Sequence, residues 1–304
     1  MLTQPQRYLM QLFGMDILDV LLWASLMILI VAAILPKKNG YYAAAVGWVI
    51  FGVSWFLKAP GFFFDESNIL YTVLCLLALP LTLYAAYILI RFQRESLMVV
   101  TRSVAISGLF YAPFAFIPML NHWLIGFTAD LTLACVQAIG YPATRLNFDT
   151  ISLHGQEVQI ILACTAIQSI AIFVGIVFCI RVETNRMLKA FLISVPLIYL
   201  LNLIRNTFVI SAYGNQWLQI IPETVTEWTG KNVEYTSFFW AHNIIAEAGA
   251  LIALVFISYV VLNTMPELLD YLQDVLNLLK IENIKSLLDG KDVTVITPTQ
   301  IKSK

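Results

Sequence analysis

The sequence predicts a polytopic membrane protein built almost entirely of helices. Of its 304 residues, 60% are hydrophobic and only 12% are charged, about half of the ~25% that soluble domains carry. Several apolar segments are long enough to cross a bilayer. So few charged groups leave too little polar surface to cover a water-soluble particle, and the net charge of −1 offers no basic surface for nucleic acid. The composition therefore argues against a soluble enzyme, a disordered chain and a nucleic-acid-binding domain.

We predict seven transmembrane helices joined mostly by short connections. They cover residues 17–35, 41–57, 70–90, 97–120, 165–180, 188–213 and 239–262. The run at 123–139 is also apolar, but it is short and contains Asp130 and Gln137, so we interpret it as an interfacial or re-entrant helix. Counting it as an eighth span would reverse the orientation of everything that follows.

Basic residues orient the predicted bundle. They gather in the connections after the first, third and fifth spans, at Lys37, Lys38, Arg91, Arg94, Arg181, Arg186 and Lys189. If the spans alternate, these connections share one side, which the positive-inside rule makes cytoplasmic. The N-terminus then lies outside the cell membrane and the C-terminus inside.

Two segments outside the spans have patterns of their own. Apolar and polar residues alternate on both sides of His154-Gly155, which predicts an extracytoplasmic β-hairpin before the fifth span. Residues 266–288 place leucines opposite acidic residues, which predicts an amphipathic helix on the membrane or under the bundle. We therefore divide the chain into a transmembrane domain, residues 1–264, and a cytoplasmic helix and tail, residues 265–304.

An arginine lies deep within an apolar span. Arg205 is about eight residues from the outer end of its predicted helix, or ~12 Å at 1.5 Å per residue. Asn202 shares its helix face and Asn206 is adjacent. Ionisable residues inside membranes are costly and usually functional, so this polar stripe is expected to face a partner or a water-filled cavity. The alternative is an arginine that extends to the outer interface.

One of four cysteines has a distinctive position. Cys75, Cys135 and Cys179 fit as small apolar residues in helices. Cys164 falls at the predicted N-terminus of the fifth span, followed by Thr165 and with Gln168 one turn on. A helix N-terminus favours the thiolate and offers backbone N–H groups to an oxyanion. The alternative is that Cys164 is also only an apolar helix residue.

A histidine opens the last span at the same membrane side. His242 is followed by Asn243, and Glu247 lies one turn deeper. Histidine is the side chain best suited to proton transfer near neutral pH. Glu247 is placed either to pair with Arg205 or to orient His242. The alternative is an interface histidine that caps a helix.

These residues can converge on one site. Cys164, Arg205 and His242 are separated by 41 and 37 residues, about one span plus a loop each. Together they supply a thiolate nucleophile, a cationic stabiliser and a proton carrier. The chain has no HExxH motif, and its histidines lack zinc-ligand spacing, so we expect no metal and no organic cofactor.

Three motifs in this order resemble the exosortase/archaeosortase family, and its archaeosortase A branch most. They are the stretch at 163–169 (ACTAIQS), the stretch at 201–206 (LNLIRN) and His242-Asn243. The resemblance covers residues 145–262, whereas the first four spans match in hydropathy only. It implies a membrane cysteine transpeptidase whose catalytic residues are Cys164, Arg205 and His242. The supporting residues are then Thr165, Gln168, Asn202, Asn206, Asn243 and Glu247. Some archaeosortase A proteins have arginine in place of His242.

The resemblance also implies substrates and a reaction. Such enzymes recognise C-terminal sorting signals of secreted surface proteins, such as archaeal S-layer glycoproteins, made of a Pro-Gly-Phe motif, an apolar span and a basic tail. They remove the span and transfer the new C-terminus to a membrane phospholipid through a thioester, with the active site facing outside. The alternatives are a bacterial exosortase acting on a Pro-Glu-Pro signal, an intramembrane cysteine protease that uses water, and a seven-span transporter or receptor.

Overall fold

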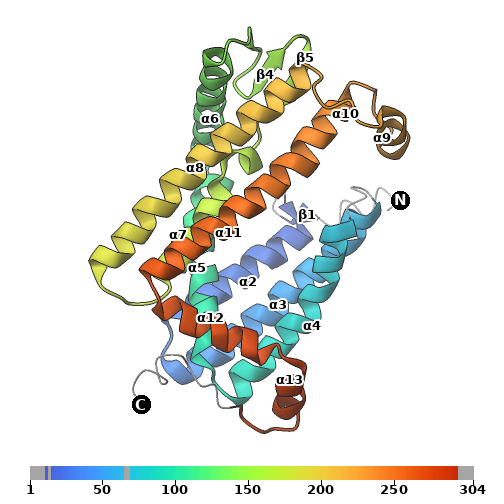
Figure 1. Ribbon diagram of the computed structural model, residues 1–304. Coiled ribbons are helices and arrows are strands. Elements are labelled where there is room, and N and C mark those ends of the chain that lie inside the picture. The colour runs from blue at the N-terminus through green and yellow to red at the C-terminus, as the bar shows by residue number, and fades with distance from the viewer. Residues whose placement is uncertain (1–10, 13–14, 65–68, 294–304) are drawn as a thin grey trace. The chain divides into compact units, whose positions relative to one another are not determined.

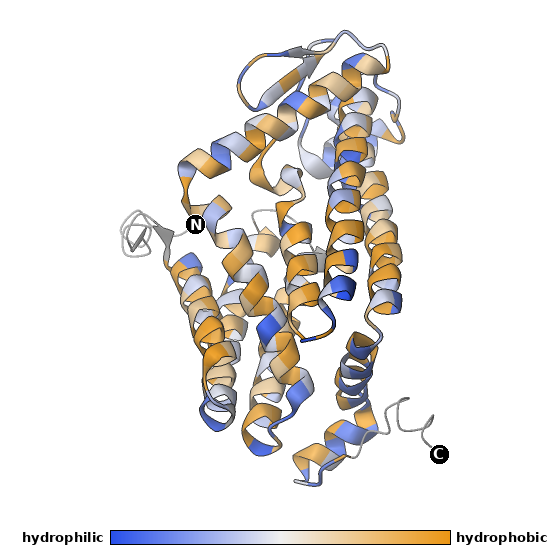
Figure 2. Cartoon of the chain, turned by 90° about the vertical axis from the view of Figure 1, so that its left-hand side faces the viewer, coloured by the Kyte–Doolittle hydropathy of each residue, from blue (hydrophilic) through white to orange (hydrophobic). Residues whose placement is uncertain are grey.

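The helical class predicted from the sequence is confirmed by a computed structural model, which describes residues 11–12, 15–64 and 69–293 (Figure 1). Seven helices have the length and composition of membrane spans: Ile17–Ile34, Lys38–Phe64, Tyr71–Arg91, Glu95–Phe116, Pro118–Ala138, Thr184–Gly214 and Tyr235–Thr264. Hydrophobic residues predominate along them (Figure 2). The chain forms two compact units: unit 1 contains residues 1–109, 178–181 and 266–304, and unit 2 contains residues 110–177 and 182–265.

Unit 1 is built on closely packed helices. A short strand pair, β1 (Gln11–Leu12) and β2 (Met15–Asp16), precedes α2 (Ile17–Ile34), α3 (Lys37–Phe64), α4 (Ile69–Arg91) and the first part of α5 (Glu95–Phe116). A Cβ atom at Gly52 of α3 would lie 1.8 Å from Thr82 Oγ1 of α4. Because only glycine fits there, the backbones of α3 and α4 approach closely, as small residues allow in membrane helix pairs.

The C-terminal amphipathic segment belongs to unit 1 and packs on α4. It forms two helices, α12 (Glu267–Leu278) and α13 (Ile281–Leu288), rather than one over 266–288. The Tyr84 hydroxyl donates to the Leu278 carbonyl at 2.8 Å, and the Tyr87 hydroxyl donates to the Leu287 carbonyl at 3.0 Å. These hydroxyls satisfy carbonyls that a helix C-terminus leaves unpaired. Tail residues 294–304 lie outside the described residues.

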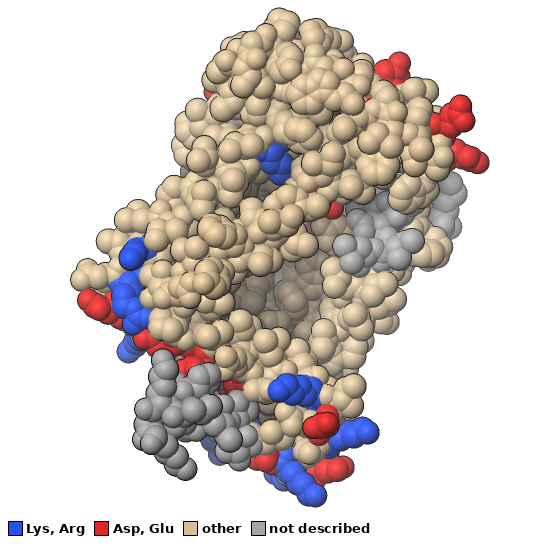
Figure 3. Space-filling model, viewed as in Figure 1, with Lys and Arg blue, Asp and Glu red and all other residues tan. Residues whose placement is uncertain are grey.

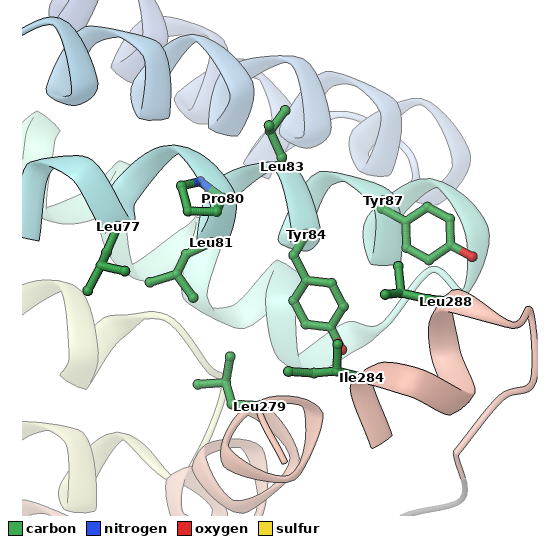
Figure 4. Close-up of a pocket in the computed structure, with 9 residues that line it drawn as sticks. All are labelled: Leu77, Pro80, Leu81, Leu83, Tyr84, Tyr87, Leu279, Ile284 and Leu288. Atoms are coloured by element: carbon green, nitrogen blue, oxygen red, sulfur yellow. The ribbon is translucent and has the colours of Figure 1, made fainter. Parts of the chain in front are cut away.

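An apolar cavity of about 570 Å³ lies between α4 and the two C-terminal helices (Figure 4). Its walls are leucine, isoleucine, proline and tyrosine side chains. They come from Leu77, Pro80, Leu81, Leu83, Tyr84, Tyr87, Leu279, Ile284 and Leu288.

Unit 2 carries the predicted hairpin. Strands β3 (Thr144–Arg145), β4 (Thr150–Leu153) and β5 (Gln156–Gln159) form an antiparallel sheet in the order β3-β4-β5. His154 and Gly155 both have positive φ, 51° and 83°, as a two-residue hairpin turn of type I′ requires. The hairpin prediction is confirmed, and β3 is an additional strand that the alternation did not reveal.

Unit 2 also contains helices of widely different lengths. They are α6 (Pro118–Ala138), α7 (Ile167–Phe178), α8 (Thr184–Gly214), α9 (Pro222–Thr229), α10 (Tyr235–Phe238) and α11 (Glu247–Thr264), with a 3₁₀ turn at Leu162–Thr165 and a π-helix, η2, at Phe239–Ala246. A Cβ atom at Gly214 would lie 2.4 Å from Leu153 Cγ. The absence of a side chain there lets the end of α8 rest directly on β4.

Three of the predicted segments have clearly different lengths in the structure, and one of them is α3, which has 28 residues where residues 41–57 were expected. The short interfacial or re-entrant helix expected at 123–139 is instead a 21-residue apolar helix, α6. Its polar residues do not shorten it, because Asp130 pairs with Arg145 of β3 and Gln137 Nε2 donates to the Ala143 carbonyl at 2.9 Å. The span expected at 165–180 is a 12-residue helix, α7.

The sheet contains a carboxylate that stabilises the hairpin. Asp149 is buried and accepts hydrogen bonds from Gln159 Nε2 at 2.7 Å and Thr150 Oγ1 at 2.9 Å. The hydrogen bond from Gln159 is the largest influence, and together with that from Thr150 it holds the pKa of Asp149 below its ordinary value despite burial. The carboxylate therefore stabilises the fold at pH values above its unfolded pKa, ~3.9, and this stabilisation is lost as pH falls through the lower folded pKa.

We expect Asp149→Asn to lower the free energy of unfolding by about 1–2 kcal/mol at pH 7, since hydrogen bonds to a charged group are lost. The difference from wild type should shrink as the pH falls from the unfolded pKa, ~3.9, through the lower folded pKa, where the folded wild-type carboxylate becomes protonated. Thermal unfolding in detergent at several pH values measures this. Glu157→Gln, at an exposed position on β5, is the matched control and should have no comparable effect. A pH-independent difference would contradict the electrostatic explanation.

Candidate active site

Cys164 lies in a turn and not at the N-terminus of an α-helix. It belongs to the 3₁₀ turn Leu162–Thr165, which is followed by Ala166 in the left-handed conformation with φ 62°, and α7 begins only at Ile167. A left-handed alanine is uncommon and costs energy. Cys164 was expected at the start of the helix, but it lies three residues before it. Other groups must therefore hold the turn in place.

Two asparagine side chains hold the Cys164 turn. Asn202 Nδ2 and Asn206 Nδ2, one helical turn apart on α8, donate to the Cys164 carbonyl at 2.8 and 2.9 Å. Asn206 is only 5% exposed, so its amide depends on this partner for a buried hydrogen bond. The polar stripe predicted on this helix therefore faces a partner, which is the backbone of the cysteine turn.

Arg205, between these asparagines in sequence, contacts the histidine. Its Nη2 lies 3.2 Å from His242 Nε2, and its side chain is half-buried. Figure 3 shows that the face in view is mostly uncharged and that most of its basic and acidic groups lie toward its edges. α8 thus links all three predicted catalytic residues, because the five residues 202–206 contact both the backbone of Cys164 and the ring of His242.

His242 lies in the π-helix, which the sequence did not reveal. This segment, Phe239–Ala246, interrupts an otherwise α-helical span, and π turns occur frequently at functional sites. The His242 ring stacks on Phe238 with centroids 4.9 Å apart and planes 9° apart, and its Nδ1 lies 2.7 Å from Asn243 Oδ1. No apolar periodicity predicts a π turn, because hydropathy does not report the backbone hydrogen-bond pattern.

The remaining predicted residues lie apart from these contacts. Thr165 is fully buried and donates to the Leu162 carbonyl at 2.7 Å within its own turn. Gln168 and Glu247 are exposed. Both ring nitrogens of His242 contact other groups, Arg205 and Asn243. Among the described residues, no cluster of histidine, cysteine and acidic side chains could hold a metal ion.

The paired asparagine contact predicts a graded loss of function. Asn206→Ala removes one of two donors to the Cys164 carbonyl, and Asn202→Ala,Asn206→Ala removes both. At ~1 kcal/mol per hydrogen bond, we expect substrate processing to slow about five-fold in the single variant and more than 20-fold in the double variant. Asn215→Ala, at the end of α8 and bonded to Ser211, is the control. Equal processing rates in all variants would show that the hydrogen bonds from Asn202 and Asn206 do not position Cys164.

The structure thus defines a class: a multi-span helical membrane protein with cysteine, arginine and histidine connected through one transmembrane helix. Residues 20–230 match the family described as transmembrane exosortase (Exosortase_EpsH), and the chain belongs to this family. It is similar to archaeosortase A of Haloferax volcanii, with 31% identity covering 85% of this chain and 92% of the relative. It is also similar to archaeosortase A of Natronomonas pharaonis, with 26% identity covering 87% and 90%. No solved structure matches the chain.

Proposed function

We propose that this protein is a cysteine transpeptidase that cleaves a C-terminal sorting signal from secreted surface proteins and transfers the new C-terminus to a membrane lipid. The observation that carries the proposal is the linkage through α8: Asn202 and Asn206 hold the Cys164 turn while Arg205 contacts His242. The archaeosortase A relatives support this type of reaction. The signal we propose contains a Pro-Gly-Phe motif, an apolar span and a basic tail.

The first half-reaction forms a thioester. The Cys164 sulfur attacks the scissile carbonyl carbon, and its proton passes to His242 Nε2. In the free protein, Arg205 contacts this nitrogen. Its guanidinium must therefore leave His242 and turn toward the carbonyl oxygen, where negative charge develops. The tetrahedral intermediate then collapses. The C–N bond breaks, and the leaving amine takes the proton from His242.

The second half-reaction transfers the substrate. A headgroup amine attacks the thioester carbon and gives a proton to His242. The C–S bond breaks, and the sulfur recovers the proton. The product is an amide between the surface protein and the lipid, and the enzyme returns to its starting state. A site within the bilayer suits this step because the thioester and the lipid meet in two dimensions.

The topology that we propose places this site near the outer leaflet. Arg186 Nε donates to the carbonyl of Thr264, the last residue of α11, at 3.0 Å. The connection before α8 carries the basic residues Arg181, Arg186 and Lys189, and the positive-inside rule assigns such a connection to the cytoplasmic side.

Depth along α8 follows from its length. From Thr184, at the start of α8, to Asn206 the helix rises by ~33 Å at 1.5 Å per residue. This distance is close to the ~30 Å of a bilayer core. The Cys164 turn, bonded to Asn206, therefore lies near the outer surface if Thr184 lies near the inner surface.

We expect the processed product to carry a lipid. Purified enzyme in liposomes would be given a substrate containing the Pro-Gly-Phe motif, an apolar span and a basic tail, with and without an amine-headgroup phospholipid. The mass of the new C-terminal peptide should increase by one lipid only when the amine lipid is present. A substrate with Pro-Glu-Pro in place of Pro-Gly-Phe is the specificity control. A bare carboxyl end under both conditions would make this protein a protease that uses water.

A further inference from the structure

The side chain that orients the histidine is the strongest unassigned feature of the site. His242 Nδ1 lies 2.7 Å from Asn243 Oδ1, the shorter of its two polar contacts. Asn243, His242 and Arg205 therefore form a continuous chain of polar side chains through the last span and α8.

The chemistry of the partners determines the hydrogen positions on the ring. A guanidinium can donate hydrogen bonds but cannot accept them, so His242 Nε2 presents its lone pair to Arg205. The neutral ring then carries its hydrogen on Nδ1, where the amide oxygen of Asn243 accepts it. Each ring nitrogen then has a partner of the matching kind, a donor at Nε2 and an acceptor at Nδ1, and this assigns the tautomer.

We propose that Asn243 is a positioning residue that holds His242 in the Nδ1–H tautomer, so that Nε2 is the nitrogen that exchanges protons with Cys164. Without Asn243, the hydrogen could move to Nε2 once Arg205 turns toward the substrate, and the ring could no longer accept the thiol proton there. The role of His242 in this inference rests on the proposed function. The tautomer itself does not, because it follows from the contacts alone.

Packing supports this assignment. Phe238 stacks on the imidazole at 4.9 Å, which holds the ring plane but not the hydrogen. Glu247, on the same helix, is the acidic group that acts on the ring electrostatically, but it is exposed. Asn243 therefore does for this imidazole what an amide does in the Cys-His-Asn set of papain-like proteases, with an arginine added on the opposite ring nitrogen.

The tautomer can be read directly, because the chain has three histidines. His122→Phe preserves the ring contact with Phe148, and His154→Asn suits the positive φ of the hairpin turn. In this background, ¹⁵N-histidine labels His242 alone. The ¹⁵N chemical shifts and two-bond couplings of the full-length protein in nanodiscs distinguish a protonated from an unprotonated ring nitrogen.

We expect one Nδ1–H tautomer in the background protein and a mixture of both tautomers in Asn243→Ala. Asn243→Asp should retain the Nδ1–H tautomer, because a carboxylate oxygen still accepts from Nδ1. Processing by Asn243→Ala should slow about 10- to 100-fold at unchanged KM, which is part of the ~10²–10⁴-fold that acid–base catalysis supplies. Asn243→Asp should recover much of that loss. Asn263→Ala, an exposed position at the far end of the same helix, should match the background protein in both measurements.

The two proposals fail in different measurements. A single Nδ1–H tautomer in Asn243→Ala would overturn the positioning role, whatever the rate of processing. A tautomer mixture with an unchanged rate would also overturn it. Normal processing by Cys164→Ala would overturn the proposed function and leave the tautomer result standing.

Discussion

Cys164→Ala should abolish processing of a sorting-signal substrate, with a loss of at least about 10⁴-fold, because no other group replaces a covalent nucleophile. The variant should still fold. The contacts that hold the turn are made by the Cys164 carbonyl with Asn202 and Asn206, and alanine keeps that carbonyl. The gel mobility of a co-expressed substrate measures the effect, with membrane accumulation of each variant as the check on folding.

The other cysteines provide matched controls. None of Cys75, Cys135, Cys164 and Cys179 forms a disulfide, and Cys75 and Cys179 are buried in unit 1. Each alanine variant should process substrate at the wild-type rate. A transporter or receptor would tolerate Cys164→Ala as well, so normal processing by that variant would remove the enzymatic proposal.

Hydropathy predicted the helical class because a bilayer demands long apolar helices whatever their tertiary contacts. It failed for α6 and α7, where the length of the helix depends on partners from elsewhere in the chain. Arg145 pairs with Asp130 and so removes the apparent penalty in α6. The start of α7 is delayed by the left-handed Ala166, and a sequence pattern does not show that the helix begins at Ile167, two residues later than predicted.

In the candidate site, likewise, the residues could be predicted from the sequence but their contacts could not. The sequence was enough to select Cys164, Arg205 and His242. Polar and ionisable groups in apolar spans are costly and are usually kept for function. Their contacts could not be predicted, because they depend on the register between helices. Glu247 lies one turn from His242 in sequence but is exposed, whereas its neighbour Asn243 makes the contact with the ring. The π-helix, which periodicity did not predict, contains both His242 and Asn243.

Arg205→Lys should slow processing about 10²- to 10³-fold, the loss typical of removing one oxyanion donor, although it retains the positive charge. A guanidinium offers five donors in a planar fork, so it can contact His242 in the free protein and turn to the oxyanion during the reaction. The compact ammonium of lysine cannot serve both positions with the same geometry. Arg205→Ala should be slower still, because the oxyanion then has no cation.

Single-turnover rates of thioester formation would separate this effect from substrate binding, since the loss should fall on the chemical step and leave KM nearly unchanged. Arg102→Lys is the matched control, because Arg102 pairs with Glu95 at 2.9 Å within unit 1 and should tolerate the exchange. If Arg205→Lys reacts as fast as wild type, Arg205 supplies only charge. The contact of 3.2 Å between Arg205 and His242 would then belong to the free protein only, and the geometry of the guanidinium would not matter in the reaction.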